Sequence, residues 1–565
     1  MSSASRSCVQ RPAEHNILNR IGPRLSAGAA GTADTTRVTA PEFNESEASL
    51  LSRYFTNLDR PVFALRNLPE VVKGALFSRY SRTEKSLRRV LLDEFINDPD
   101  SGFDRLAGSP PVDDDMVAVR RAEDFYERVL VGYGDDSVAE LAGAHVAVEQ
   151  VSMLGAKALE DSRIGISPLE KSTRYVRFDR AGFDGRFLYH RGEELGHPAY
   201  EPAMDELFDT YSRLVEPTTQ AIRERYPREA EETDRAWKSA TRAKALDLLR
   251  GLLPAGALTN LGLFGNGRAF EYLITKMAGH ELPECRRLAT DLHRELSLVI
   301  PSFVRRALDD RYGMPAAERL ERVRSATQRL ARRDPTQATS PSVRLVDFDL
   351  DAERKVVAAA MFPGSTLPLE AQTGDPGVVL EALLADRANR RQRAPRALEH
   401  AEYTFEIVAN FGAYRDLHRH RMLTQDRQLL GTSLGYDVPP AVAELGVDDG
   451  YRRAVERAAE VHAVLEQALG PAPAQYVVPM AFHVRWYFRA NLREVYHLCE
   501  LRTTPQGHPD YRWVAQEMFR RVEEVHPRLA GYARFVDLGR GDELERRASE
   551  RRIDDKLSSI DRRVR

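Results

Sequence analysis

The chain repeats itself, and a repeat restricts the choice of fold more strongly than composition does. Three stretches recur in the same order in the two halves of the sequence. They are VVKGALF (71–77) with VVAAAMF (356–362), SVAELAGAHVAVEQV (137–151) with RALEHAEYTFEIVAN (396–410), and FGNGRAFEYLITKM (264–277) with RANLREVYHLCELR (489–502). The alignment sets Glu140 opposite Glu399, and Asn266 and Arg268 opposite Asn491 and Arg493. Two collinear copies of one unit are expected to fold as two similar domains.

Each copy has the pattern of an α+β unit. The stretches at 71–77 and 356–362 are helix-forming, an alternating apolar pattern after Glu140 and after Glu399 indicates a strand, and the third stretch reads as an amphipathic helix. A unit of this kind spans roughly 200 residues or more. The predicted fold is therefore α+β, with two tandem domains forming a pseudo-dimer. A second chain would complete a pseudo-tetramer, so we expect a homodimer.

Composition shifts place the boundaries of these domains. Residues 1–45 are small and polar without a period, which predicts a flexible leader. The first domain is predicted at 46–331 and the second at 343–540, joined by the Pro, Ser and Thr-rich linker 332–342. Residues 541–565 mix both charges with few apolar anchors and are expected to form a charged tail, a solvated helix.

Charge and cysteine content exclude several classes of protein. The 565 residues contain 82 Lys and Arg against 85 Asp and Glu, a net charge of -3, so no overall basic field exists to gather nucleic acid. The three cysteines, Cys8, Cys285 and Cys499, lie far apart without metal-ligand spacing. We expect no metal, no disulfide, no membrane span and a cytoplasmic location.

The triplet Arg419-His420-Arg421 carries little information alone, because a basic triplet is usually a solvated surface. Its context is more specific. Glu399-His400 precedes it, and Asn491, Arg493 and Arg502 follow with the spacing N-x-R-x8-R. This constellation resembles the flavin-dependent thymidylate synthases, whose signature reads R-H-R-x-x-S-x-N-E-x-S-x-R-Y. The resemblance implies FAD as cofactor, bound by these residues of the second copy: Glu399, Arg419, His420, Arg421, Asn491, Arg493 and His497.

Each copy keeps the half of that signature which the other has lost. The second copy has Leu429, Gly431 and Thr432 where S-x-R-Y is expected in register, and a four-residue slip would give Ser433, Gly435 and Tyr436. The first copy keeps Glu170, Ser172, Arg174 and Tyr175. At the triplet it has Glu160, Asp161 and Ser162 or nearby residues, and Met277 stands where the second copy has Arg502.

Complementary losses suggest one complete site shared by the two copies. By the resemblance, the nucleotide would be bound by Glu170, Ser172, Arg174 and Tyr175 of the first copy with Arg419 and Arg502 of the second. Ser172 and Arg502 would serve the chemistry, with Arg502 stabilising negative charge on the pyrimidine. The predicted stoichiometry is one FAD per chain. Whether the shared site lies within one chain or between two chains stays open.

The resemblance implies C5-methylation of a uridine monophosphate, with 5,10-methylenetetrahydrofolate as carbon donor and NADPH as the source of hydride. The sequence does not choose between UMP and dUMP. Asp416 stands where the family usually has Gln, and Asp135 replaces a common His, so the pocket differs from that of typical members. Two rivals remain: a degenerate flavin- or nucleotide-binding protein without activity, and, less favoured, an arginine-rich nucleic-acid-binding scaffold.

Overall fold

The computed structural model describes residues 42–81, 83–97, 138–162, 164–179, 181–182, 184–331, 340–540 and 544–564. The leader up to residue 41, Asp135 and most of the predicted linker lie outside the described residues. Two compact units are distinguished, residues 1–64 and residues 65–565, and the second contains nearly all of both repeats. The first unit holds α1 (Glu45–Leu51), which begins at a capping box between Asn44 and Glu47.

The described elements of the second unit follow the order of the repeat. Those up to residue 331 are α2 (Glu70–Tyr80), α3 (Leu87–Leu91), β1 (Gly143–Ser152), α6 (Met153–Glu160), β2 (Ile166–Glu170), α7 (Tyr200–Arg225), α8 (Asp234–Leu249), β3 (Leu258–Asn266), α9 (Gly267–Ala278), α10 (Pro283–Leu296), α11 (Pro301–Val304) and α12 (Gly313–Leu330). Those that follow are β4 (Ser342–Phe348), α13 (Ala352–Met361), α14 (Pro376–Leu384), β5 (Glu402–Asn410), α15 (Phe411–Leu417), β6 (Leu423–Arg427), α16 (Pro440–Glu444), α17 (Asp448–Leu469), α18 (Pro471–Ala474), β7 (His483–Asn491), α19 (Leu492–Arg502), α20 (Pro509–Val525), α21 (Pro527–Ala530) and α22 (Arg547–Val564).

Two antiparallel sheets form the framework of this unit. The first has the strand order β1-β3-β2, and the second has the order β4-β5-β7-β6. Strands β5, β7 and β6 therefore repeat the order of β1, β3 and β2, and β4 is added at the edge. The predicted strands after Glu140 and Glu399 are β1 and β5, and the predicted helices lie in α2, α13, α9 and α19. These four helix predictions and two strand predictions are confirmed.

The helices that follow the central strands begin in the same way in both copies. In β3 buried and exposed residues alternate, as expected for a strand with one face in the core. Asn266 ends β3 and caps α9, and its side chain accepts a hydrogen bond from the N–H of Ala269. Asn491 ends β7 and caps α19 by accepting from the N–H of Glu494. Asn is a preferred capping residue, which explains why it recurs at this point of the repeat.

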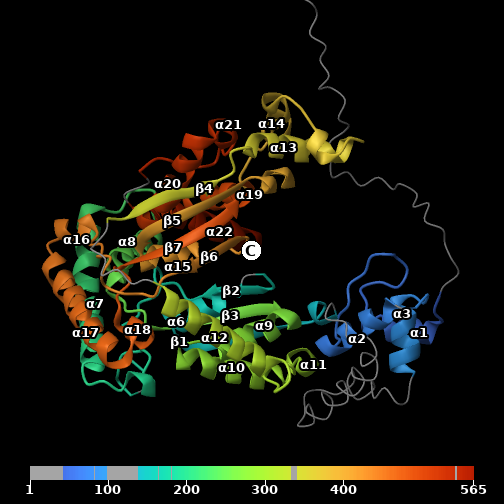
Figure 1. Ribbon diagram of the computed structural model, residues 1–565, viewed down its shortest axis with the longest axis horizontal. Coiled ribbons are helices and arrows are strands. Elements are labelled where there is room, and N and C mark those ends of the chain that lie inside the picture. The colour runs from blue at the N-terminus through green and yellow to red at the C-terminus, as the bar shows by residue number, and fades with distance from the viewer. Residues whose placement is uncertain are drawn as a thin grey trace, which may run out of the picture. The chain divides into compact units, whose positions relative to one another are not determined.

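The two copies meet through α6 and α15, which lie between the sheets (Figure 1). Backbone hydrogen bonds across this contact are reciprocal. The N–H of Gly256 donates to the carbonyl of Tyr476 over 2.8 Å, and the N–H of Ala481 donates to the carbonyl of Gly251 over 2.9 Å. When the two capping residues, Asn266 and Asn491, are aligned, Gly256 is the counterpart of Ala481 and Gly251 is the counterpart of Tyr476. Each copy thus offers the same backbone segment to the other.

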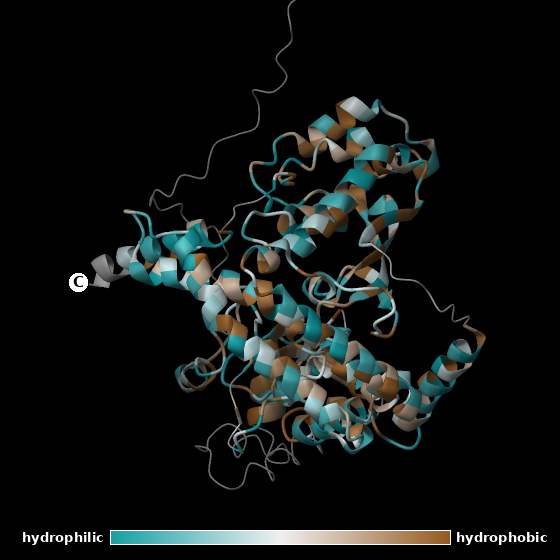
Figure 2. Cartoon of the chain, turned by 90° about the vertical axis from the view of Figure 1, so that its left-hand side faces the viewer, coloured by the Kyte–Doolittle hydropathy of each residue, from teal (hydrophilic) through white to brown (hydrophobic). Residues whose placement is uncertain are grey.

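Amphipathic helices cover the outside of this framework. On α17 the buried residues recur at helical spacing, from Tyr451 through Ala454, Val455 and Ala458 to Leu465, and α7 packs beside it. Figure 2, viewed from this side, shows hydrophilic and hydrophobic residues mixed along each helix. Among the described residues, no helix has the length and apolarity that a membrane crossing requires.

The charged C-terminal segment forms a helix, as expected, but it is more firmly attached than a solvated tail. On α22, Arg547 and Arg551 form ion pairs with Glu229, and Asp554 pairs with Arg235 at the start of α8. Just before α22, Glu545 is buried and binds Lys244 over 2.6 Å. The segment is rich in both charges because its cationic and its anionic side chains both form ion pairs with the first copy.

Candidate active site

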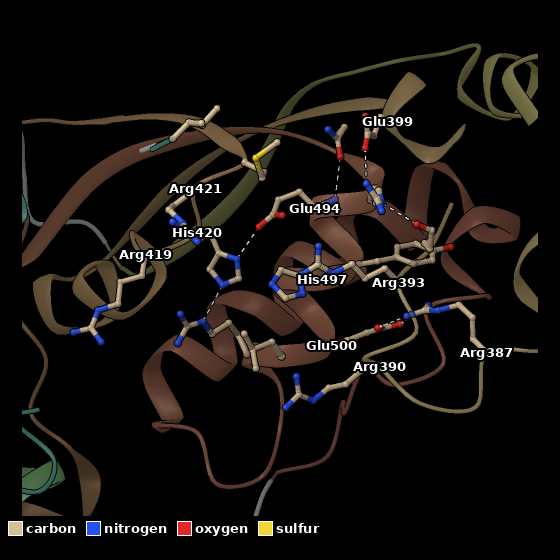
Figure 3. Close-up of a pocket in the computed structure, with 18 of the residues that line it drawn as sticks. Arg387, Arg390, Arg393, Glu399, Arg419, His420, Arg421, Glu494, His497 and Glu500 are labelled. Atoms are coloured by element: carbon tan, nitrogen blue, oxygen red, sulfur yellow. Dashed lines mark hydrogen bonds and ion pairs between the residues drawn. The ribbon is translucent and has the colours of Figure 1, made fainter. Parts of the chain in front are cut away.

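A cavity of about 530 Å³ lies at the start of α19, beside the turn that contains the predicted triplet. Seven of its described lining residues are arginines and three are glutamates. All the residues predicted to hold the cofactor line it: Glu399, Arg419, His420, Arg421, Asn491, Arg493 and His497. In Figure 3 the side chains of His420, from the triplet, and His497, from α19, point toward the same space, whereas that of Arg419 points away from it. A cavity with this excess of positive charge suits a polyanionic ligand.

His420 is fixed by two hydrogen bonds. Its Nδ1 lies 2.7 Å from Oε1 of Glu494, and Nε of Arg502 donates to its Nε2 over 3.0 Å. Because Nε2 accepts from a guanidinium, the ring proton is assigned to Nδ1, which donates to Glu494. Burial and the charge of Arg502 hold the pKa of His420 well below its usual value, so the imidazole is neutral.

His420, Glu494 and His497 also form a group whose potential metal-ligating atoms all lie within 4.8 Å of one another. The sequence did not indicate this group, since its members are far apart in the chain. The guanidinium of Arg502 already binds Nε2 of His420, and it would repel a cation bound there. The arrangement therefore fits an anion better than a metal ion.

Arg493 is oriented by two acceptors. Its Nη1 lies 2.6 Å from Oε1 of Glu399, and its Nε donates to the carbonyl of Ala394 over 2.7 Å. Asn491 uses its side-chain oxygen to cap α19, so its amide N–H groups are the atoms left to meet a ligand.

Three lining arginines were missed by the sequence analysis: Arg387, Arg390 and Arg393. Arg387 forms a buried pair with Glu500 over 2.7 Å. Arg390 and Arg393 form no ion pair with any described residue, and Figure 3 shows both beside the cavity. The stretch RANRRQRAP (387–395) was the available signal, but a run of arginines usually means a solvated surface.

Residues of the first copy reach the triplet. Nη1 of Arg421 donates to Oγ of Ser167 and to the carbonyl of Ile166, both over 2.9 Å. Nη2 of Arg419 donates to Oε2 of Glu170 over 3.0 Å. The triplet and the segment that precedes S-x-R-Y therefore touch within one chain.

Glu170 is the centre of a buried ionic cluster. Besides Arg419 it binds Arg415 over 2.6 Å and Lys157 over 3.0 Å. Burial alone would raise the pKa of Glu170, but the charges of Arg415, Lys157 and Arg419 outweigh it and hold the pKa below its usual range. Glu170 is thus ionised and binds Arg419 of the triplet. Its carboxylate is surrounded by cationic side chains and does not line the cavity at α19.

His418, just before the triplet, links α15 to the end of α6. Its Nε2 bonds Oδ1 of Asp161, and its Nδ1 lies 3.7 Å from Oε2 of Glu160. Burial lowers the pKa of His418, yet Asp161 and Glu160 outweigh it and raise the pKa above its usual value. His418 is the cation of this contact.

Arg174 of the S-x-R-Y segment is held by a carboxylate. Its Nε and Nη2 donate to Asp247 over 2.8 Å and 2.7 Å, and Nη1 lies 3.4 Å from the hydroxyl of Tyr511. The guanidinium of Arg502 lies 5.6 Å from the centre of the same Tyr511 ring. Tyr511, which the sequence did not single out, therefore stands between two of the three predicted nucleotide-binding arginines, Arg174 and Arg502.

The rest of the segment is less enclosed. The Ser172 hydroxyl accepts from the N–H of Arg174 over 3.2 Å, and the half-exposed Tyr175 ring lies 4.2 Å from the guanidinium of Arg546. Neither Ser172 nor Tyr175 lines the cavity at α19.

Asp416 and Arg250 complete the cluster. Nη1 of Arg250 donates to Oδ2 of Asp416 over 2.9 Å; Arg250 is buried and Asp416 is half-buried. Burial raises the pKa of Asp416, but Arg250, Arg419 and Arg174 outweigh it, so the carboxylate stays ionised. Sequence reasoning marked Asp416 as a departure but missed Arg250, whose signal was a single arginine in LLRGLLP.

Equivalent backbone hydrogen bonds in the two sheets show which residues of the second copy correspond to the S-x-R-Y segment of the first. The N–H of Lys171 donates to the carbonyl of Asn260, and the N–H of Gln428 donates to the equivalent carbonyl of Arg485. Leu429, Gly431 and Thr432 therefore stand at the places of Ser172, Arg174 and Tyr175, and the four-residue slip is excluded. Ser152 caps α6 and Asn410 caps α15, so these two residues are equivalent. Counting from them, Asp161 stands at the place of Arg419 and Ser162 at the place of His420. The predicted alignment, which began at Glu160, is therefore shifted by one residue.

Two similar α+β units that share a charged cluster define a duplicated protein with one arginine-lined cavity. Residues 97–302 and 344–528 match the model of the family described as thymidylate synthase complementing protein. The chain belongs to this family, and its two matched regions correspond to the two copies of the repeat.

The chain is also similar to individual proteins. A UPF0159 protein of Chlamydia muridarum is 44% identical over 519 residues, which cover 89% of this chain and 97% of that protein. A flavin-dependent thymidylate synthase of Sulfolobus acidocaldarius is 27% identical over 205 residues, covering 34% of this chain and 76% of that protein. A crystal structure of the UMP/dUMP methylase PolB from Streptomyces cacaoi, with 5-Br dUMP bound, is 21% identical with a TM-score of 0.31, covering 36% of this chain and 98% of that chain.

Proposed function

We propose that this protein is a flavin-dependent methylase that acts on C5 of a uridine monophosphate, either UMP or dUMP. The observation that carries the proposal is the meeting of the two half-signatures in one chain, through Arg421 with Ser167 and Arg419 with Glu170. Neither copy has both halves, so the contact supplies what each has lost.

The cavity at α19 suits FAD. Arg390, Arg393 and Arg421 have no carboxylate partner among the described residues, and the cofactor has a diphosphate and, when reduced, a negatively charged ring. Arg493 and the amide of Asn491 would hold the cofactor, and His420 would face its ring system. When bound, FAD would supply hydride, which NADPH replenishes, to a carbon unit donated by 5,10-methylenetetrahydrofolate.

The protein's own part in the reaction is electrostatic. Arg502 is half-buried; its Nε is used by His420, and its Nη groups form no ion pair with a described carboxylate. A guanidinium in a dry site stabilises negative charge that develops on the pyrimidine as C5 becomes nucleophilic. Neutral His420 adds no second charge beside Arg502, and burial raises the pKa of Glu494.

The nucleotide would bind between Arg174 of the first copy and Arg419 and Arg502 of the second, with Ser172 as a further donor. Arg174 is held by Asp247, so this carboxylate orients its guanidinium toward a phosphate that shares its remaining donors. Asp416 in place of Gln adds a negative charge at this point. A second chain would associate with the first, giving a homodimer of four domains.

The same ion pairs favour a second candidate, a flavin- or nucleotide-binding protein without activity. If Asp247 and Asp416 keep their arginine partners when a nucleotide is present, the phosphate has no site. The flavin would then bind, but methylation would not follow. The distinction is made by experiment.

The test is tritium release from 5-tritiated UMP and dUMP with purified protein, FAD, NADPH and methylenetetrahydrofolate. We expect release from at least one nucleotide, and loss of release in Arg502→Ala and Arg174→Ala. Flavin-coloured protein without release from either nucleotide would support the binding protein. Protein that takes up no flavin and releases no tritium would contradict both.

A further inference from the structure

A second cavity, of about 580 Å³, shares no described lining residue with the one at α19, although Asp247 and Arg250 of the charged cluster stand in its wall. Its walls come from the end of α8, the start of α15, the segment before α16, and α17 and α20. The residues that matter here are Arg250, Asn410, Asp437, Tyr451, Asp510 and Trp513. Cavities of this size hold small molecules.

The equivalent place on the other side of the reciprocal contact is filled by a side chain. There the ring of Tyr476 stacks on His190 with their centres 4.8 Å apart, and its hydroxyl donates to Oε2 of Glu284 over 2.8 Å. Glu284 also accepts from the N–H of Ser152, the cap of α6. An aromatic ring with one hydrogen-bond donor thus closes the first-copy site.

Each of these residues has a counterpart at the open cavity. The N–H of His190 donates to the carbonyl of Gly256, and the N–H of Asp437 donates to that of Ala481, which makes Asp437 the counterpart of His190. Glu284 and Asp510 are the second residues of α10 and α20, and Ser152 and Asn410 are the caps of α6 and α15. The counterpart of Tyr476 is Gly251, which has no side chain to fill the space.

Glycine is required at 251 because a Cβ there would collide with the Tyr451 hydroxyl. Tyr451 and Trp513 give the cavity aromatic walls. The Tyr451 hydroxyl thus takes the place where the side chain of residue 251 would begin, and the rings of Tyr451 and Trp513 are surfaces against which a planar ligand can pack.

The polar groups of the cavity form a distinct pattern. Nδ2 of Asn410 donates to Asp437 over 2.8 Å and to Asp510 over 2.7 Å, so the two carboxylates lie side by side. Asp437 also bonds Nε2 of His483 over 2.8 Å through its other oxygen, and the lone pairs that the two carboxylates have left, those of Asp510 above all, are acceptors for further donors. Nη2 of Arg250 is buried without a hydrogen-bond partner among the described residues, and the arginine is 4% exposed. It is a donor that needs an acceptor.

We propose that this cavity binds a planar heteroaromatic ring that carries amino or ring N–H donors beside a carbonyl or ring-nitrogen acceptor. Guanine and pterin rings both have this edge. The donors would bind Asp510 and Asp437, the acceptor would bind Arg250, and the ring would lie against Trp513. The paired carboxylates repel phosphate, so the ring rather than a phosphate is recognised.

The test is isothermal titration calorimetry of the full chain with guanosine and, separately, 6-methylpterin, which distinguishes the two sources of the ring. We expect at least one to bind with a Kd at or below the millimolar range. Asp510→Asn turns one acceptor into an amide and should weaken binding at least tenfold. The matched control, Asp291→Asn, changes an exposed carboxylate on α10 and should leave the Kd unchanged.

Two further measurements keep the proposal open to contradiction. Trp513→Ala should weaken the same ring severalfold, and it replaces Asp510→Asn if that variant fails to fold in a thermal melt. Absence of binding by both rings at millimolar concentration would overturn the proposal, as would unchanged binding in Asp510→Asn. Displacement of the ring by UMP would assign the cavity to the nucleotide site instead.

Discussion

At the scale of single residues, Arg493 and Arg268 form a natural matched pair. Each stands two residues after the asparagine that caps its helix, and each binds one glutamate, Glu399 over 2.6 Å and Glu140 over 2.9 Å. Only Arg493 lines the cavity at α19. The two positions differ in their surroundings far more than in their local structure.

Replacing Arg493 with Ala should therefore weaken FAD binding by at least tenfold, because a charge-assisted contact in a cavity contributes about 1.5–3 kcal/mol. Replacing Arg268 with Ala should leave FAD affinity unchanged. Fluorescence titration of the apoprotein with FAD measures both. Equal loss in the two variants would mean that the first copy also binds flavin.

The pH dependence of stability gives a test of His418. Its pKa is raised in the folded chain, so its ion pairs stabilise the fold fully below the unfolded pKa of about 6.5 and are lost as the pH rises through the folded value. The difference in stability between the wild type and His418→Gln should shrink as the pH rises above about 6.5. Urea unfolding at several pH values measures it, and a difference that grows with pH would contradict the assignment.

Residue identities in the second copy were predictable because the triplet, Asn491 and Arg493 occur at fixed spacing. The partners of those residues were not. Asp247, Arg250 and Tyr511 are ordinary residues on helices and turns, and only the fold brings them to Arg174 and Asp416. Arg390 and Arg393 were also missed, because a run of arginines in a sequence does not indicate which of them face a cavity.

At the scale of elements, α6 and α15 are the contact that joins the copies. Both are short, both begin at a polar cap, and their facing residues are charged: Lys157 and Glu160 on one, Arg415 and His418 at the end of the other. Glu170 at the end of β2 ties the two helices together. The helices and strands themselves followed from apolar periodicity, but the charge pairing between them did not.

Removing the charge of Glu170 should be costly. In Glu170→Gln the buried Arg415 and Lys157 lose a carboxylate, which should destabilise the fold by about 3–5 kcal/mol. Glu140→Gln breaks an exposed pair and should cost about 0–1 kcal/mol. Urea unfolding of both variants measures the difference, and equal effects would show that the α6–α15 contact contributes little.

At the scale of the whole molecule, duplication has allowed two copies to diverge. The first copy keeps the Ser172–Tyr175 segment and has Met277 where the second has Arg502, and the second keeps the triplet but has Gly431 in place of Arg174. The repeat and the division of the signature were readable from the sequence. That the halves touch inside one chain was not, because sequence does not report how two domains dock.

Contacts within the chain have a consequence for mixed oligomers. Arg174→Ala and Arg421→Ala should each abolish turnover. Because Arg421 meets the first copy of its own chain, mixing the two variants should recover no activity. The tritium-release assay measures the activity of the mixture. Recovery of about a quarter of the wild-type activity or more would place the site between chains.

The count of flavins per chain tests the account most directly. Protein saturated with FAD and freed of excess cofactor is compared for flavin absorbance and chain concentration. One FAD per chain is the predicted result, because among the described residues the arginine-lined cavity and the triplet belong to the second copy. Two FAD per chain would contradict the division of the site between the copies.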